Sequence, residues 1–182
     1  MVISMKNGKF LFGLVYPKDA DELLFRAVDE FCTAVKNCVG DTLFCTSEEV
    51  LERNVYLGET DRTKKTFPDP PSMERTGADG YELRVRADGI FVRAVSSEGV
   101  LYGVYALLKE MFGAEFFGYG EFFYPKCDSI NLPEGDFFCV PDIETRVRSL
   151  SWTKYDELTE RRFGYNVGNG RYWITWAHTF FE

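Results

Sequence analysis

The stretch from Gly80 to Gly113, GYELRVRADGIFVRAVSSEGVLYGVYALLKEMFG, predicts two antiparallel strands that lead into one buried helix. Strand-forming side chains dominate residues 81–85 and 90–95. Between these two runs, Ala87-Asp88-Gly89 predicts the tight turn of a hairpin. A helix that follows a hairpin can bury its apolar face on the strands, so we expect this stretch to organise the rest of the domain.

The helix of this stretch is expected to be buried along one face. Ser96 can cap its first turn, because a serine oxygen accepts hydrogen bonds from free backbone N–H groups, and Gly113 is placed to end it. Gly99 and Gly103 leave one line of the helix without side chains, which predicts close packing against the backbone of the sheet. The apolar face consists of Val100, Leu101, Val104, Leu107, Leu108 and Met111.

The residues before this stretch predict a second helix and further strands. The run KFLFGLVY at 9–16 is typical of a buried strand. Asp19 and Glu22 form a capping-box pattern for an amphipathic helix over 20–39. Short strands are expected at 43–45, 55–58, 130–132 and 137–140, and a short helix around 47–52.

Residues 61–79, DRTKKTFPDPPSMERTGAD, are polar and contain three prolines. This composition predicts a loop. A loop of this length in a domain is either functional or mobile, and we expect a mobile excursion.

Net charge and cysteine pattern limit the partners and the compartment. The 182-residue chain has a formal net charge of −8 and a sequence pI near 4.8, which argues against nucleic acid or an anionic membrane as its main partner. Its five cysteines are scattered without a CxxC pair, so we expect reduced thiols and a cytoplasmic location rather than a disulfide framework. The N-terminus lacks the pattern of a signal peptide, and no apolar run is long enough to span a membrane.

Most catalytic machinery has no counterpart in the sequence. The only histidine, His178, excludes an HExxH metal helix, and no glycine-rich phosphate loop is present, so we expect neither a metal nor another cofactor. Asp156 and Glu160 share one helical face in YDELTERR. We expect this segment to be a solvated, salt-bridged turn that continues into Arg161 and Arg162, rather than a catalytic carboxylate pair.

The character of the sequence changes at Pro141. Residues 1–140 predict one α/β domain. Residues 141–182 contain a strand-like run at 146–152 and an aromatic, glycine-containing tail, which predict the opening of a second domain that the chain does not complete.

Three sequence features, in this order, resemble the region before the catalytic barrel in certain glycoside hydrolases. They are the strand starts Asp79-Gly80-Tyr81 and Asp88-Gly89-Ile90, the helix EGVLYGVYALL at 98–108, and Pro141-Asp142-Ile143-Glu144-Thr145-Arg146. Together they resemble the N-terminal accessory domain of the family 20 β-N-acetylhexosaminidases and the family 67 α-glucuronidases. The similarity is greatest to a bacterial group of predicted glycosidases with the same accessory domain.

The resemblance implies a fold and a function. The fold is a two-layer α/β sandwich in residues 1–140, with a mixed sheet and two main helices on one face, followed in 141–182 by the incomplete start of a (β/α) barrel. The function is that of a non-catalytic N-terminal domain that supports its own catalytic barrel in a carbohydrate-acting hydrolase. The catalytic acids of these families lie beyond residue 182, so we assign no catalytic residue and expect the chain alone to be inactive.

Two residues match substrate-facing positions of the resembled families. The counterpart of Arg146 binds sugar hydroxyls at the end of the first barrel strand, a role that suits a planar guanidinium; the alternative is an ordinary salt bridge. His178 matches a position where a histidine hydrogen-bonds a sugar; the alternative is a surface histidine near the chain end. Core packing rather than sugar stacking is expected for the aromatic residues Trp152, Tyr172, Trp173 and Trp176.

Two other classes of function remain open. A carbohydrate-binding module would need an exposed aromatic platform. A stand-alone interaction protein would form a homodimer through the aromatic residues of 147–182.

Overall fold

The computed structural model describes residues 2–3, 5–6, 9–48, 51–118, 120–146 and 157–166. Its helices are α1 (Glu22–Cys38), α2 (Asp61–Thr66), α3 (Met73–Thr76), α4 (Ser97–Phe112) and α5 (Glu157–Arg162). Its strands are β1 (Val2–Ile3), β2 (Met5–Lys6), β3 (Lys9–Phe10), β4 (Gly13–Val15), β5 (Cys45–Thr46), β6 (Asn54–Leu57), β7 (Tyr81–Arg86), β8 (Gly89–Arg93), β9 (Glu115–Gly118), β10 (Glu121–Phe123), β11 (Asn131–Leu132) and β12 (Gly135–Cys139).

A six-stranded mixed sheet forms the centre of the domain, in the order β12–β7–β8–β6–β4–β5. The strands β12, β7 and β8 are antiparallel neighbours, and β7 and β8 are joined by the predicted tight turn. From β8 to β5 all neighbours are parallel. The hairpin of the Gly80–Gly113 stretch therefore supplies the point at which the parallel and the antiparallel halves of the sheet meet.

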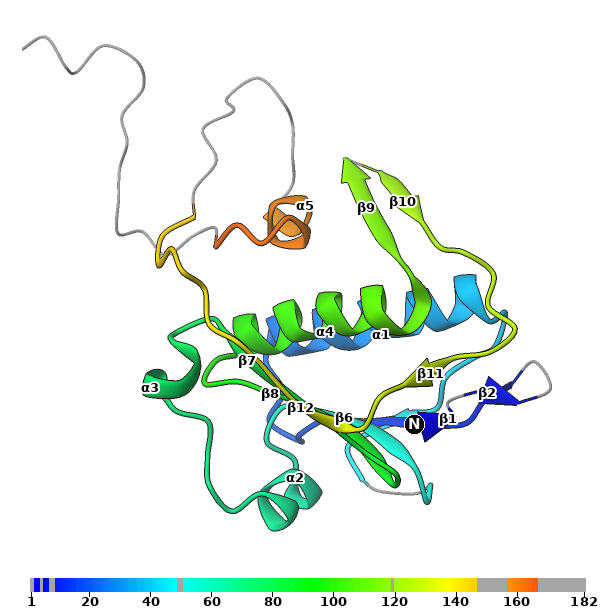
Figure 1. The fold of residues 1–182 in the computed structure, drawn as a ribbon, viewed down its shortest axis with the longest axis horizontal. Helices are drawn as coiled ribbons and strands as arrows, with labels where there is room; N and C mark the ends of the chain where they lie inside the picture. The colour runs from blue at the N-terminus through cyan, green and yellow to red at the C-terminus, as the bar shows by residue number, and fades with distance from the viewer. Residues whose placement is uncertain are drawn as a thin grey trace, which may run out of the picture.

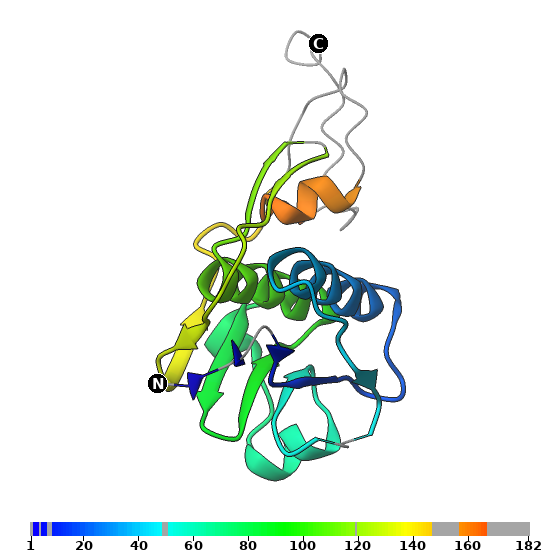
Figure 2. The ribbon, with the colours of Figure 1, turned by 90° about the vertical axis from the view of Figure 1, so that its right-hand side faces the viewer.

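The helices α1 and α4 lie side by side on one face of this sheet (Figures 1 and 2). Their apolar sides and the side chains that point toward them from alternate strand positions form one buried core. Phe31 of α1, Leu101 of α4 and Val92 of β8 are fully buried in it. The predicted two-layer α/β sandwich, with a mixed sheet and two main helices on one face, is confirmed.

Gly99 and Gly103, the glycine line of α4, pack against the β7–β8 hairpin. A Cβ atom at Gly99 would lie 2.5 Å from the carbonyl oxygen of Gly80, and one at Gly103 would lie 2.5 Å from Cγ1 of Val92. The expected close approach to the sheet backbone is therefore confirmed at Gly99, whereas Gly103 makes room for a strand side chain. The predicted helix ends are also confirmed: Ser96 accepts from the Gly99 N–H at 3.2 Å, and Gly113 adopts a left-handed conformation with φ of 66°.

Two local predictions were wrong: the residue that caps α1, and the short helix around 47–52. The cap of α1 is Asp21, whose carboxylate accepts from the Leu24 N–H at 2.9 Å. Asp19 instead lies in a turn that precedes the helix. The short helix expected around 47–52 is replaced by bends in its described residues. The Thr46 hydroxyl accepts from the Glu48 N–H at 3.1 Å, which satisfies the backbone in a turn rather than a helix.

Residues 59–79 cover the face of the sheet opposite α1 and α4, and Figure 1 shows α2 on that side. Phe67 packs edge-on against Phe91 with ring centroids 5.0 Å apart. Phe91 in turn stacks on Tyr56 at 4.7 Å. This segment also forms the helices α2 and α3, so the prediction of a mobile loop was wrong.

A buried arginine fastens this segment to the sheet. Arg93 of β8 is fully buried and ion-pairs with Glu59 at 2.7 Å and with the equally buried Glu82 at 3.3 Å. It also donates to the backbone carbonyl of Asp69 at 2.8 Å. Arg75 of α3 pairs with the same Glu82. Sequence-distant charges thus order a stretch whose own composition is that of a loop.

A second hairpin, formed by β9 and β10, projects from the end of α4 past the helical layer (Figure 2). Phe116 and Phe122 are paired across it and contact each other with ring centroids 5.8 Å apart. Phe117 and Phe123 remain exposed. The hairpin forms one side of the region that holds the residues after Pro141.

Candidate functional site

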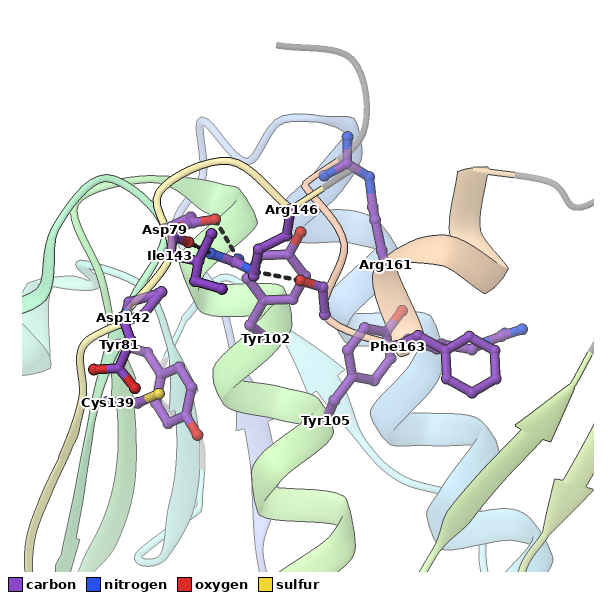
Figure 3. Close-up of a pocket in the computed structure, with 13 residues that line it drawn as sticks. Asp79, Tyr81, Tyr102, Tyr105, Cys139, Asp142, Ile143, Arg146, Arg161 and Phe163 are labelled. Atoms are coloured by element: carbon purple, nitrogen blue, oxygen red, sulfur yellow. Dashed lines mark hydrogen bonds and ion pairs between the residues drawn. The ribbon is translucent and has the colours of Figure 1, made fainter. Parts of the chain in front are cut away.

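The described residues from Pro141 onward lie over the outer surface of α1 and α4. They are the irregular segment 141–146 and the segment 157–166 with α5, which lies above α4 in Figure 1. A cavity of about 430 Å³ opens between them and the domain. Three tyrosines, three arginines and two aspartates contribute to its wall (Figure 3).

Arg146, the predicted sugar-binding residue, lies at this cavity, and each of its three guanidinium nitrogens donates a hydrogen bond to the protein. It donates to Oδ2 of Asp79 at 2.6 Å, to the Gly164 carbonyl at 2.6 Å and to the Ile143 carbonyl at 2.8 Å. It also lies over the ring of Tyr102 at 5.7 Å. Figure 3 shows the guanidinium pointing toward Asp79. These are the contacts of the salt-bridge alternative, and the sugar-binding role stays a prediction.

Asn166 completes the connection between the two segments. Its side-chain oxygen accepts from the Arg146 N–H at 2.7 Å, and its amide nitrogen donates to the Glu144 carbonyl at 2.6 Å and to Asp79 at 3.1 Å. Both Asp79 and Asn166 are buried. Asp79 is thus the shared acceptor that ties both segments to the start of β7.

A second connection joins α5 to the first turn of α4. Arg161 ion-pairs with Glu98, and both side chains are largely buried. Tyr102 lies one turn further along α4. Its hydroxyl oxygen is 3.1 Å from the Glu98 carboxylate and 2.8 Å from the Tyr165 carbonyl, and the hydroxyl can donate its proton to either acceptor. Burial lowers the pKa of Arg161. A carboxylate partner offsets the cost of burying that charge.

A third connection joins α5 to the middle of α1. Arg162 ion-pairs with Glu30, whose side chain is 5 % exposed. The same guanidinium lies 4.4 Å from the ring centroid of Phe122 and 5.7 Å from that of Phe116. Arg162 therefore links three elements: α5, α1 and the β9–β10 hairpin.

Two of the tyrosines in the cavity wall, Tyr81 and Tyr105, are neutral groups. Burial, reinforced by the Cys139 thiol, raises the pKa of Tyr81. Burial, reinforced by Glu30, raises the pKa of Tyr105. Both phenols therefore keep their protons at neutral pH and can donate hydrogen bonds. The site can hold a polypeptide segment or a polar molecule through such donors. Among the described residues that line it, Asp79 is engaged by Arg146, so they present no pair of free carboxylates of the kind that glycoside hydrolysis uses.

The segment YDELTERR differs from its prediction. It contains α5 rather than a solvated turn, and Arg161 is 6 % exposed. The reason is that both arginines find carboxylate partners on α1 and α4. Asp79 belongs to the motif that carries the family resemblance, but the sequence pattern does not indicate its role as a shared acceptor. It does not indicate the roles of Glu98 and Glu30 either. A buried glutamate on an otherwise apolar helix face was the available signal at Glu30.

Several predictions fall on residues outside the described part of the chain. His178 and the first carboxylate of the expected surface turn, Asp156, are among them, as are the aromatic residues of 172–176. Arg146 itself lies in irregular backbone, and the rest of the strand expected over 146–152 is not described. The boundary near 140, the homodimer through 147–182 and the carbohydrate-binding alternative therefore stay predictions.

The described residues contain neither a metal-binding cluster nor a membrane-spanning helix. No group of three or more histidine, cysteine, aspartate or glutamate side chains could hold a metal ion there. Within the same residues, the helices are too short or too polar to cross a membrane.

The fold and the anchored segment after Pro141 define an α/β domain whose buried carboxylates hold the segment that follows it. Residues 6–107 match the family model described as Glycosyl hydrolase family 67 N-terminus, and the chain belongs to this family. It is an accessory domain of the carbohydrate-acting glycoside hydrolases, as the sequence predicted. A search of curated proteins found no match.

Solved structures of glycoside hydrolases share the fold. A family GH115 4-O-methyl-α-glucuronidase with specificity for decorated arabinogalactans aligns with a TM-score of 0.56 and 12% identity, over 74% of this chain and 18% of that one. The GH20 β-N-acetylhexosaminidase of Streptomyces coelicolor A3(2) aligns with a TM-score of 0.53 and 16% identity, over 80% of this chain and 25% of that one. The chain thus spans a quarter or less of the length of these enzymes.

Proposed function

We propose that the domain positions the catalytic barrel of a glycoside hydrolase, and that this barrel lies on the outer side of α1 and α4. One observation carries the proposal: the segment after Pro141 is held on that side by three ion pairs between largely buried side chains. The pairs are Arg146–Asp79, Arg161–Glu98 and Arg162–Glu30.

The location of the three carboxylates supports a positioning role. Asp79 precedes β7, Glu98 lies in the first turn of α4, and Glu30 lies in the middle of α1. Three anchors on three elements fix both the place and the orientation of the segment that they hold. Arginine suits this task because its planar fork of donors constrains direction as well as distance.

The chemistry would then reside in the barrel. Glycoside hydrolysis uses two carboxylates on opposite sides of the bond that is cleaved. Of the two carboxylates among the described residues that line the cavity, Asp79 is engaged by Arg146, which leaves Asp142 as a single carboxylate. We therefore assign the domain a structural contribution to the activity of the whole enzyme.

The test uses the complete gene product that contains residues 1–182. Arg162→Ala is compared with Glu48→Gln, which removes the exposed ion pair between Lys18 and Glu48. We expect Arg162→Ala to lower kcat/KM for an aryl glycoside several-fold, or to lower the unfolding temperature of the catalytic domain, and Glu48→Gln to do neither. A gene product that ends at Glu182 would overturn the proposal, as would an Arg162→Ala enzyme with unchanged activity and unchanged thermal transitions.

A further inference from the structure

Two cysteines from different elements meet on the side of the domain away from the anchored segment. Cys32 of α1 and Cys45 of β5 have their sulfur atoms 3.1 Å apart. This is about 1 Å longer than the 2.05 Å of a disulfide bond. Both residues are half-buried rather than enclosed in the core.

We propose that Cys32 and Cys45 form a redox-active pair that is converted to a disulfide by exchange with a low-molecular-weight disulfide such as oxidised glutathione. The proposal is independent of the proposed function. It concerns residues that take no part in the three anchoring ion pairs. The sequence pattern predicted only reduced, scattered thiols, because the two cysteines share no motif.

The environment of the pair favours Cys45 as the attacking sulfur. A hydrogen bond from Cys32 lowers the pKa of Cys45, against the opposing effects of burial and of Asp29. The same hydrogen bond, together with burial, raises the pKa of Cys32. Since the thiolate is the reactive form, we take Cys45 as the nucleophile and Cys32 as the resolving thiol.

The reaction balances in two exchange steps. The Cys45 thiolate attacks one sulfur of the oxidant, forms a mixed disulfide with it and releases the first thiolate. Cys32 then loses its proton and attacks the Cys45 sulfur, which releases the second thiolate. The two cysteines are oxidised by two electrons, the oxidant is reduced to two thiols, and the two cysteine protons end on those thiols.

The disulfide would fasten an edge of the sheet to the helical layer. β5 pairs with β4 through two residues, Cys45 and Thr46. A bond from Cys45 to α1 would close the chain between Cys32 and Cys45 into a loop. Closing a loop removes conformational freedom from the unfolded chain and so stabilises the folded one.

The domain contains a matched control pair. The Cys127 N–H donates to the Cys38 carbonyl at 3.0 Å, so these two residues are also neighbours. Burial raises the pKa of both of their thiols. Cys38 and Cys127 should therefore react more slowly with a disulfide than Cys45 does.

The test incubates the purified chain with oxidised glutathione, blocks free thiols with iodoacetamide and maps cross-linked peptides by mass spectrometry. We expect one intramolecular link, between Cys32 and Cys45, in the wild type and in the Cys38→Ser/Cys127→Ser variant. We expect the oxidised protein to unfold about 6–12 °C higher than the reduced one, since a loop of this size contributes a few kcal/mol. Dithiothreitol should reverse the shift, and Cys32→Ser should abolish it.

Three results would overturn the proposal. The first is full alkylation of both Cys32 and Cys45 after oxidation. The second is a stable glutathione adduct on Cys45 in the wild type, because it would mean that Cys32 does not resolve the mixed disulfide. The third is a link between Cys38 and Cys127 that forms in preference.

Discussion

Asp79 accepts a hydrogen bond from Arg146 at 2.6 Å across 67 positions of the sequence. The carboxylate stands at the start of the hairpin strand β7, and the guanidinium lies where the chain leaves the sheet domain. The side chains are 8% and 21% exposed, so the pair is largely withdrawn from water. The residue directly before the stretch that organises the sheet therefore receives the segment that follows the sheet domain.

Removing one partner of this pair should destabilise the domain strongly. Asp79→Asn leaves the Arg146 charge buried without its counter-charge, which costs on the order of 3–5 kcal/mol. Urea denaturation followed by circular dichroism measures the loss. Glu48→Gln, in the exposed pair with Lys18, should change the free energy of unfolding by less than about 1 kcal/mol. Equal effects of the two substitutions would contradict a buried role for Asp79.

The glycine line of α4 predicts intolerance to a single methyl group. Gly99→Ala would place a Cβ atom 2.5 Å from the Gly80 carbonyl, and backbone cannot yield as a flexible side chain does. We expect a loss of about 1–3 kcal/mol. Gly118→Ala is the control, because the added Cβ atom would lie at an ordinary van der Waals distance of 3.6 Å from its nearest neighbour, Oε2 of Glu121. A thermal midpoint for Gly99→Ala at or above that of Gly118→Ala would refute the close contact.

Alkaline pH should destabilise the protein partly through Cys38. Burial, with a smaller effect of the neighbouring Cys127, raises the pKa of this thiol to about 12 from an ordinary value of 9.0. The stabilising contribution is complete below pH 9. It declines as the pH rises toward 12, because the unfolded chain releases a proton that the folded chain retains. Stability measured in reductant at pH 8.5 and 10.5 should fall less in Cys38→Ala than in the wild type. Parallel losses in the two proteins would argue against a buried, protonated thiol.

The buried arginine of β8 should control the order of residues 59–79. Arg93→Ala leaves Glu82 fully buried without this partner and removes the hydrogen bond to the Asp69 carbonyl. We expect a loss on the order of 3–5 kcal/mol and faster cleavage between 61 and 79 by a protease. Arg62→Ala, which removes the exposed ion pair with Asp88, is the control. If both variants resist cleavage as the wild type does, Arg93 does not fasten the segment.

The parts of the fold that follow from short-range pattern were predictable. The hairpin, α4 and the Gly113 end all lie within Gly80–Gly113, where alternation, helical spacing and caps act over a few residues. The predicted position of the α1 cap was wrong by two residues, because Asp19 and Asp21 are equally suitable residue types for a cap. Only the turn before the helix decides between them.

The parts that depend on distant partners were not predictable. Residues 61–79 read as a loop because their order comes from Arg93, which lies on another strand. The same holds for the site: Arg161 and Arg162 follow acidic residues and read as a solvated run. Their partners Glu98 and Glu30 lie 63 and 132 positions away. No spacing pattern within a few residues predicts such a pair.

One face of the six-stranded sheet is covered by α1 and α4 and the other by residues 59–79. Further strands could therefore add to the sheet at its two edge strands, β5 and β12. The edge strand β5 is two residues long, which is too short to pair with another strand. The edge strand β12 is longer, and its Phe138 is 51% exposed. Self-association of the isolated chain at high concentration should therefore begin at β12. Phe138→Glu is then the substitution of choice for solubility, since Arg84 lies close enough to receive the new charge.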